Sequence, residues 1–400
     1  RLALARREAV PHQIKSNQTI ITTTKQQNRS PKTMKLFINK FVLALAVLGS
    51  ATNAQYGNAQ STATDTSDYE WTSVDVTLPK PISDHTATLS RNNGLVYIAG
   101  GCDSPLGNEF AGDFFFCASL SDKLYVFDPT ASTVSDLGQM PRTRYRHSAN
   151  IVGNELWLIG GRDEEDNIIT EIDIYNIESA EWRTLTLQDD FLTSDQASFT
   201  GDSSSKFIYV AGGYNATYAA LATVFRIDTT TSAEGGLASI GVMAPLQEAR
   251  GDIEAASDGN TAFLGGGFTD ANGFCAPLPT VESYNIAGNT WKYESDLIND
   301  RGEVNMVELN GQVFAMGGER QIDNICEITG DTDPGELTVG LEVVEVLESG
   351  TWEVVDNFPT HRFRLAAVGY DETNKIYVFG GQVNYDDSCE CFKTTDDIQT

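Results

Sequence analysis

A short apolar segment that ends in two glycines occurs six times in this chain, and this repetition limits the folds the chain can adopt. Each copy contains a bulky aromatic ring. The copies are Val96–Gly101, Leu156–Gly161, Ile208–Gly213, Ala262–Gly267, Val313–Gly318 and Ile376–Gly381. Apolar runs this short, rich in β-branched and aromatic residues, predict buried strands rather than core helices. The glycine pairs allow a positive φ or a close backbone approach where each strand ends.

The spacing of the copies predicts a circular all-β fold. The last glycines of successive copies stand 60, 52, 54, 51 and 63 residues apart. A period of roughly 50 residues with four strands per repeat is typical of a β-propeller. Although a length of 400 residues suggests two or three domains, one toroid can contain most of such a chain.

Tryptophans mark the outer strands of several repeats. Trp182, Trp291 and Trp352 each follow a strand that comes after a glycine pair. Trp71 lies in a similar segment but precedes the first repeat, whereas the chain ends soon after Gly381 without such a strand. We therefore expect the Trp71 segment to complete the last sheet, because this pairing removes the exposed edges of an open propeller.

With six glycine pairs, spaced tryptophans and the strand tyrosines Tyr175 and Tyr284, the chain resembles the kelch-repeat β-propellers over residues 70–400. The resemblance implies an all-β, six-bladed propeller with four-stranded blades, closed by pairing of the N-terminal strand with the C-terminal blade. The fifth repeat departs from the pattern, since we place Glu345 at its strand-tyrosine position.

The segment after Met34 has the pattern of a secretory signal peptide. Two lysines precede an apolar run at residues 41–48, and small residues follow before Gln55. The run is shorter than the roughly 20 residues needed to span a bilayer. We therefore predict a secreted protein without membrane insertion.

This interpretation divides the chain into four parts. Residues 1–33 are upstream sequence without a folding role, and residues 34–54 are the signal peptide. Residues 55–69 form a flexible lead-in, and residues 70–400 form the propeller. In the alternative, residues 1–33 are a true extension and the apolar run is an internal anchor.

The charge of the chain excludes two classes of partner. The whole sequence has a formal charge of −29; residues 1–54 hold nine of its 27 basic residues and one of its 56 acidic residues, so residues 55–400 carry −37. Such a surface repels phosphate backbones and anionic lipids, which argues against nucleic-acid or membrane binding. The same charge also keeps a monomer soluble, and we expect a monomer.

Long insertions follow four of the glycine pairs. They span residues 102–122, 268–280, 319–340 and 382–396. In a propeller these loops share one face with the links between blades. Since binding functions concentrate on loops held by a rigid scaffold, we expect a binding surface on this face.

All six cysteines lie in these insertions, and an even number in a secreted chain predicts disulfides. We expect Cys102 to pair with Cys117 within the first blade. The sequence leaves open how Cys275, Cys326, Cys389 and Cys391 pair with one another. A metal site is the alternative, although only the last two cysteines are closely spaced.

The links between blades carry arginines, which we assign to ligand binding. They are Arg142, Arg144, Arg146, Arg250, Arg301, Arg362 and Arg364. One hypothesis is a basic pocket around the channel mouth that binds carboxylates, sulfates or sugar hydroxyls. The resemblance implies a comparable use, because intracellular kelch domains bind acidic peptides through loop arginines. In the alternative, each arginine pairs with a neighbouring acid and joins the blades.

Three histidines follow the predicted cleavage point. His85, His147 and His361 all stand where first strands begin. Together they could hold zinc or copper, but the common origin of the repeats also explains two of them. We assign His85 and His147 to the ligand-binding set and predict no bound metal or cofactor.

The remaining motifs bear on modification and catalysis. Asn215 begins an N-glycosylation acceptor on an expected surface loop. Acidic turns at 163–167 and 331–336 lack the spacing of an EF-hand. The chain has no nucleophile elbow, zinc-protease motif or phosphate-binding loop. We therefore predict a secreted module that binds a protein or glycan; the alternative is an extracellular enzyme resembling copper-radical oxidases or sugar isomerases.

Overall fold

The computed structural model describes residues 69–400 apart from residues 105–107, 112–113, 118, 203, 233, 275, 322–337 and 387–390. All described residues belong to one compact unit, Thr64–Thr400. The predicted upstream segment, the signal peptide and nearly all of the lead-in lie outside the described residues.

Five four-stranded sheets and one three-stranded sheet follow one another along the described chain. The first three sheets are β1 (Thr86–Ser90), β2 (Leu95–Ala99), β5 (Lys123–Asp128) and β6 (Thr133–Gln139); β7 (Ser148–Val152), β8 (Glu155–Ile159), β9 (Glu171–Asn176) and β10 (Glu181–Thr186); and β11 (Ala197–Thr200), β12 (Phe207–Ala211), β13 (Val224–Ser232) and β14 (Ala238–Val242). The next three are β15 (Ala255–Ser257), β16 (Thr261–Gly265), β17 (Val281–Asn285) and β18 (Thr290–Tyr293); β19 (Asn305–Leu309), β20 (Gln312–Met316), β23 (Val343–Glu348) and β24 (Thr351–Asn357); and β25 (Ala366–Tyr370), β26 (Lys375–Phe379) and β29 (Ile398–Gln399).

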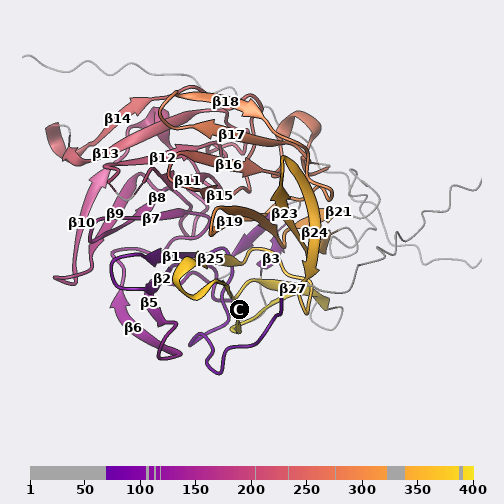
Figure 1. Ribbon diagram of the computed structural model, residues 1–400. Coiled ribbons are helices and arrows are strands. Elements are labelled where there is room, and N and C mark those ends of the chain that lie inside the picture. The colour runs from indigo at the N-terminus through magenta and orange to yellow at the C-terminus, as the bar shows by residue number, and fades with distance from the viewer. Residues whose placement is uncertain are drawn as a thin grey trace, which may run out of the picture. The chain divides into compact units, whose positions relative to one another are not determined.

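Each sheet forms one blade of a propeller. The first strands of the sheets, β1, β7, β11, β15, β19 and β25, lie around the centre in Figure 1, and each contacts the first strand of the next sheet, with β25 beside β1. Neighbouring strands within every sheet are antiparallel. The six apolar repeats form the second strands, as predicted, and the all-β class is confirmed.

Three further hairpins project from the blades. They are β3 (Asn108–Ala111) with β4 (Phe114–Cys117), β21 (Glu319–Gln321) with β22 (Thr338–Gly340), and β27 (Gln382–Asp386) with β28 (Cys391–Thr394). The helices of the described part are short 3-10 turns at Asp189–Phe191, Glu234–Gly236, Asp270–Asn272 and Asp371–Thr373. No helix in residues 69–400, as far as they are described, is long and apolar enough to cross a bilayer.

The core lies between neighbouring blades, where side chains from their facing sides are buried together. In one such layer Trp157 and Ile174 of the second blade pack with Ile208 and Phe225 of the third. Aromatic and β-branched residues are suited to these layers because they present large apolar areas on a pleated surface.

The Trp71 segment lies against the last sheet. The backbone N–H of Thr72 donates to the carbonyl of Thr400 at 2.7 Å, and the N–H of Val74 donates to Ile398 at 2.9 Å. Ser73 forms an antiparallel bridge with Gln399. The N-terminal and C-terminal ends of the described chain thus share the outer edge of the sixth blade.

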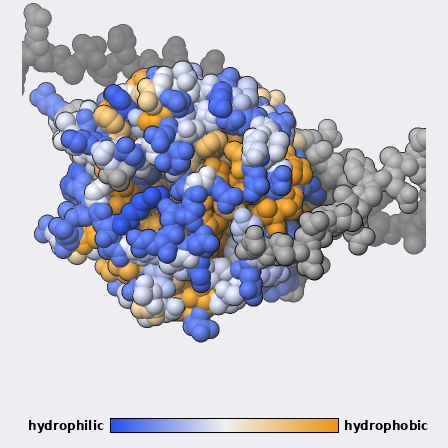
Figure 2. All heavy atoms as spheres, in the orientation of Figure 1, coloured by the Kyte–Doolittle hydropathy of each residue, from blue (hydrophilic) through white to orange (hydrophobic). Residues whose placement is uncertain are grey.

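This seam contains a cavity of about 520 Å³ between the fifth and sixth blades. Tyr69, Trp71 and Phe314 are among its lining residues. The Trp71 ring lies 4.6 Å from the Phe358 ring. Figure 2 shows hydrophobic residues gathered near β23 and β24 on an otherwise largely hydrophilic face. The seam is therefore incompletely packed.

Replacing Trp71 with alanine is expected to lower the free energy of unfolding by about 2 kcal/mol, because a half-buried ring and its aromatic contact are lost. Urea unfolding measures this change. The exposed Thr77→Ala change in the same segment serves as the control. Equal losses in the two variants would show that the Trp71 ring does not stabilise the seam.

Candidate binding site at the propeller axis

Six residues, one from each blade, occupy equivalent positions around the propeller axis, and we call them the axial ring. In every blade the preceding residue forms an antiparallel bridge with the residue that follows the glycine pair, as Ser83 does with Cys102 and Phe363 with Gln382. All six have a positive φ between 50° and 57°. They are Asp84, Arg146, Asp195, Asp252, Glu303 and Arg364.

Backbone hydrogen bonds connect the members of the axial ring. Going around the ring from Arg364 through Asp84 as far as Asp252, the backbone carbonyl of each residue accepts the N–H of the ring residue in the next blade. The donor–acceptor pairs are Asp84 to Arg364, Arg146 to Asp84, Asp195 to Arg146, Asp252 to Asp195 and Glu303 to Asp252, at 2.9–3.1 Å. A left-handed conformation costs a non-glycine residue about 1 kcal/mol or more, and the surrounding bonds hold it in place. The side chains are thereby positioned over the axis.

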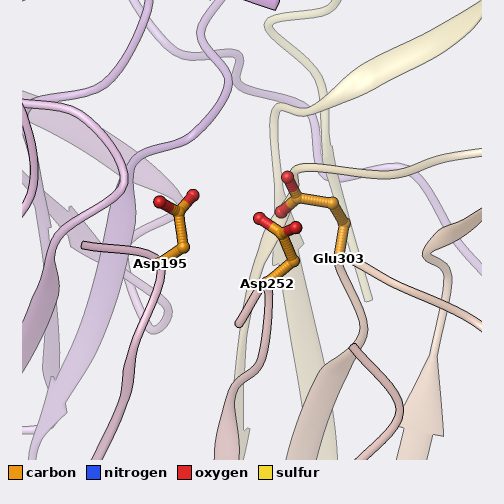
Figure 3. A group of neighbouring side chains, drawn as sticks. All are labelled: Asp195, Asp252 and Glu303. Carbon is orange, nitrogen blue, oxygen red and sulfur yellow. The ribbon is translucent and has the colours of Figure 1, made fainter. Parts of the chain in front are cut away.

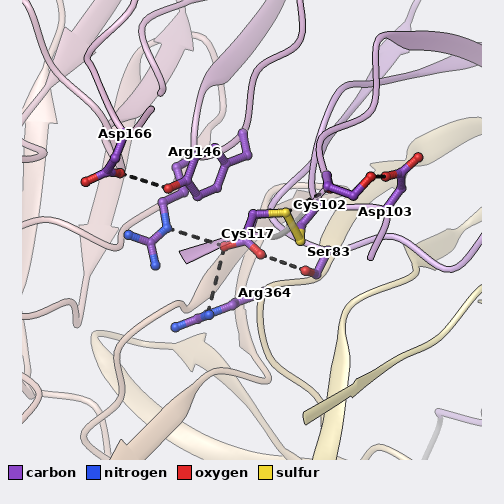
Figure 4. The surroundings of a disulfide bond; sticks show 10 residues. Ser83, Cys102, Asp103, Cys117, Arg146, Asp166 and Arg364 are labelled. Carbon is purple, nitrogen blue, oxygen red and sulfur yellow. Dashed lines mark hydrogen bonds and ion pairs between the residues drawn. A yellow bond between two sulfur atoms is a disulfide. The ribbon is translucent and has the colours of Figure 1, made fainter. Parts of the chain in front are cut away.

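The ring side chains line a pocket of about 50 Å³. Arg146 Nε lies 3.5 Å from Asp84 Oδ1 and 3.3 Å from Asp195 Oδ1. Arg364 Nε lies 3.9 Å from Asp84 Oδ1 and 3.3 Å from Glu303 Oε1. Figure 4 shows both guanidinium groups directed toward the same carboxylate. The two arginines therefore gather on the Asp84 side of the ring.

Three consecutive acids form the opposite side, and we call Asp195, Asp252 and Glu303 the acidic triad. One carboxylate oxygen from each lies within 4.8 Å of the others. In Figure 3 the carboxylates of Asp252 and Glu303 are adjacent, with Asp195 beside them. Tyr214 donates its hydroxyl to Asp252 at 2.7 Å. In the described residues no Lys or Arg lies within ion-pair distance of Asp252.

Burial raises the pKa of every member of the acidic triad. The pKa is raised to about 7 for Asp195 and Asp252 and to about 8 for Glu303. The neighbouring Glu303 carboxylate adds to the shift of Asp252. Glu254 lines the same pocket, and burial raises its pKa to about 7. Five carboxyl groups and two guanidinium groups thus line the pocket, so the expectation of a basic pocket is wrong.

The residue after each ring member fills a wedge between two blades. These wedge residues are His85, His147, Gln196, Ile253, Val304 and Leu365, and all line the pocket. Gly100 shows how closely they fit, since a Cβ there would lie 2.9 Å from His147 Cε1 and 2.5 Å from the Arg144 carbonyl oxygen. Its φ of 63° further favours glycine.

His85 and His147 are buried and neutral. Burial lowers the pKa of His85 to about 4 and takes the pKa of His147 well below its ordinary value. The third histidine is placed differently, with His361 Nδ1 2.7 Å from the Gly340 carbonyl oxygen. Within the described residues, the side chains whose ligand atoms lie close enough to share one metal ion are those of the acidic triad, which contains no histidine. The three-histidine metal site is therefore not formed.

Four of the arginines assigned to the site lie inside the blades instead. Their side chains are at most 1% exposed, and each pairs with a carboxylate near or on the third strand of its own blade. These clamp pairs are Arg144 with Asp173, Arg250 with Glu282, Arg301 with Glu345 and Arg362 with Asp397. Arg142 is 29% exposed and also pairs with Asp173. The expected placement around the mouth is thus wrong for the four buried arginines, whereas Arg146 and Arg364 do lie there.

The clamp pairs also hold the glycine turns. The Nη1 groups of Arg144, Arg250 and Arg301 donate to the carbonyls of Gly160, Gly266 and Gly317 at 2.9–3.0 Å. In the third blade Thr193 Oγ1 makes the corresponding bond to Gly212 at 2.9 Å. The clamps of Arg144, Arg250 and Arg301 therefore join a blade link to the ends of the second and third strands.

The strand pairing corrects our alignment of the fifth repeat. Trp182 pairs with Tyr175 and Trp291 with Tyr284, whereas Trp352 pairs with Leu347. Leu347 therefore occupies the tyrosine position, and Glu345 corresponds to the clamp acids. The sequence did contain a signal for this assignment. Asp173 and Glu282 stand two residues before the strand tyrosines, as Glu345 stands two residues before Leu347.

The insertions form much of the face that surrounds the axial ring. Cys102 and Cys117 form the expected disulfide, shown in Figure 4. Cys275, Cys326 and Cys389 lie outside the described residues, and only the backbone of Cys391 is described, so their pairing stays a prediction. Asn215 Oδ1 accepts the N–H of Thr217 in an exposed turn, and its glycosylation also stays a prediction.

Comparisons with known proteins identify related folds. The model of the KLHDC2/KLHL20/DRC7 Kelch-repeats domain matches residues 43–267. The chain is 24% identical to Alpha-scruin of Limulus polyphemus over 60% of this chain and 25% of that protein. It is 25% identical to Kelch-like protein terF of Aspergillus terreus over 60% of this chain and 51% of that protein. It therefore spans about half or less of these relatives.

A solved structure shows the same fold. The structure of YjhT is similar with a TM-score of 0.62, covering 81% of this chain and 96% of that chain at 15% sequence identity.

Replacing Arg301 with alanine is expected to lower the free energy of unfolding by about 3–5 kcal/mol, because it leaves the Glu345 carboxylate buried without its partner. The control is Arg142→Ala, for which about 1 kcal/mol or less is expected, since Arg144 still pairs with Asp173. Chemical denaturation measures both. A loss for Arg301→Ala no larger than the control would contradict the clamp.

Replacing His85 with glutamine is expected to flatten the acid limb of the stability profile. Between pH 6.5 and about 4 the unfolded chain binds a proton at His85 that the folded chain does not. The native state therefore becomes less stable as the pH is lowered through this range. By pH 4 this contribution reaches about 3 kcal/mol. Glutamine occupies the equivalent wedge in the third blade and does not titrate.

Urea unfolding from pH 4 to pH 7 measures the profile. His361→Gln, outside the pocket, is expected to retain the wild-type profile. Parallel profiles for the wild type and His85→Gln would show that His85 is not held neutral by burial.

Proposed function

The chain belongs to the kelch-repeat family, and we propose that it is a secreted propeller that binds a protein partner on the face carrying the insertions. The kelch-repeat domain indicates a protein-binding propeller module. The proposal adds the compartment, the face and the choice of a protein over a glycan.

The observation that carries the proposal is a continuous wall of hairpins. The hairpin of the fifth blade contacts that of the sixth through β22 and β27, and the sixth contacts the first through β28 and β3. The rings of Phe363 and Phe392 lie 5.2 Å apart at the base of the wall. A wall on one side of the axial ring offers an extended surface, which suits a polypeptide better than a small solute.

Secretion is supported by the disulfide and the sequence pattern. Cys102 and Cys117 are buried and joined, and such bonds persist mainly in oxidising compartments. The basic and apolar segment after Met34 supplies the corresponding export signal. Both features support an extracellular module.

The test uses protein collected from the medium of a secretory host that expresses the chain from Met34. We expect a mature N-terminus at Gln55 and peptide ligands when a random peptide display library is selected against the protein. The double variant Arg320→Glu, Lys393→Glu reverses two exposed charges on the wall. It is expected to weaken the selected peptides at least tenfold, because mismatched charges oppose binding.

Lys206→Glu is the matched control, since this exposed lysine lies between β11 and β12, on the opposite face. Its affinity for the peptides is expected to equal that of the wild type. If the control and the wall variant lowered the affinity for the peptides equally, the wall would not be the binding surface. Binders found on a glycan array but never in the peptide library would overturn the choice of a protein partner.

A further inference from the structure

The acidic triad is not neutralised by the other side chains of the axial ring. The ring contains four carboxyl and two guanidinium groups, and both arginines contact Asp84. Asp195 and Glu303 each share one arginine, whereas within the described residues Asp252 between them has no ion pair and contacts the Tyr214 hydroxyl and the Asp195 carboxyl. When all carboxyls are ionised, the ring therefore carries two excess negative charges on the triad side.

We propose that the acidic triad binds one divalent cation of the oxygen-preferring type, such as Ca²⁺. The three carboxylates come from the links into the third, fourth and fifth blades, and one oxygen from each lies within 4.8 Å of the others. Ca²⁺ binds oxygen at roughly 2.3–2.6 Å, so oxygens on one ion lie at most about 5 Å apart. The spacing thus suits a shared ion, and its two charges match the excess of the ring.

A second observation is independent of the carboxylate cluster. Gln196 lines the same pocket, is 2% exposed, and leaves its amide oxygen without a hydrogen-bond partner, because its nitrogen is turned toward Ser148 and Ile159. Asp195 Oδ2 also lacks a hydrogen-bond donor. Buried acceptors left unpaired cost about 1–3 kcal/mol each. Water molecules on a bound cation would donate to such acceptors.

The size of the pocket supports a hydrated ion over a larger ligand. Its volume of about 50 Å³ exceeds the roughly 10–15 Å³ that one water needs. Ca²⁺ takes six to eight oxygen ligands and commonly retains waters among them. The triad and a few waters can supply that number within this space. The two arginines flank the triad, since Arg146 pairs with Asp195 and Arg364 with Glu303, and both also lie near Asp84.

Calorimetric titration of the purified full chain with CaCl₂, after EDTA treatment and removal of EDTA, tests the site. We expect one ion per chain and a higher melting temperature in CaCl₂. Asp252→Asn and Glu303→Gln are each expected to weaken binding at least tenfold and to abolish the melting shift. Asp190→Asn, at an exposed acid outside the ring, is the matched control and is expected to bind as the wild type does.

Terbium luminescence can be measured on the wild-type protein, so the result does not depend on whether a variant folds. Tyr214 touches Asp252, so Tb³⁺ in the triad is expected to emit on excitation of tyrosine and to be displaced by CaCl₂. The Tyr214→Phe change is expected to reduce the emission without changing the affinity for CaCl₂ more than about threefold. Absence of calcium heat and melting shift in the wild type, or binding that persists in both triad variants, would overturn the proposal. Neither outcome depends on the protein-binding function of the wall.

Discussion

The buried ion pair between a link arginine and a third-strand acid is the interaction on which the geometry of the site depends. In the fourth and fifth blades, Arg250 and Arg301 reach acids 32 and 44 residues further along the chain. Removing such charges from water is costly, so the pairs persist only with their additional hydrogen bonds. The glycine carbonyls supply these bonds and fix the turn at the end of the second strand.

The clamps explain why the axis is acidic in spite of the arginines in four of the six links. Each clamp arginine stands two residues before a ring member, as Arg250 stands before Asp252 and Arg301 before Glu303. The guanidinium groups are used within the blades, whereas the side chains two residues later point to the axis with a positive φ. Charged residues only two positions apart are therefore separated in space. The clamp arginines are neutralised inside the blades, whereas the ring residues line an axial pocket with more carboxyl than guanidinium groups.

The two ends of the described chain meet in the sixth blade, which also carries one hairpin of the wall. The seam joins the Trp71 segment to β29, and the hairpins of the fifth, sixth and first blades contact one another across this junction. The wall belongs to the fifth, sixth and first blades, whereas the triad comes from the links into the third, fourth and fifth blades. This asymmetry separates a surface suited to a polypeptide from a pocket suited to an ion.

The sequence alone determined the propeller, the second strands, the pairing of the Trp71 segment and the Cys102–Cys117 bond. Most of these features depend on local signals, because glycine pairs and apolar runs act on the backbone around them, and the two cysteines lie only 15 residues apart. The distant pairing of the Trp71 segment followed instead from the outer strand that the last repeat lacks. It also identified Arg146, Arg364, His85 and His147 as residues near the axis, since all four lie in the links that lead into first strands.

The tertiary structure decided which charges face the axis and which are neutralised. Arg144 and Arg146 flank the same tyrosine, Tyr145, yet one is buried against Asp173 and the other lines the pocket. Glu345 was misassigned because the strand register places Leu347, and not Glu345, opposite Trp352. The acids of the triad are 57 and 51 residues apart along the chain, and no local pattern links them. Closure of the sheets around an axis brings their carboxylates within 4.8 Å, since equivalent positions of adjacent blades meet there.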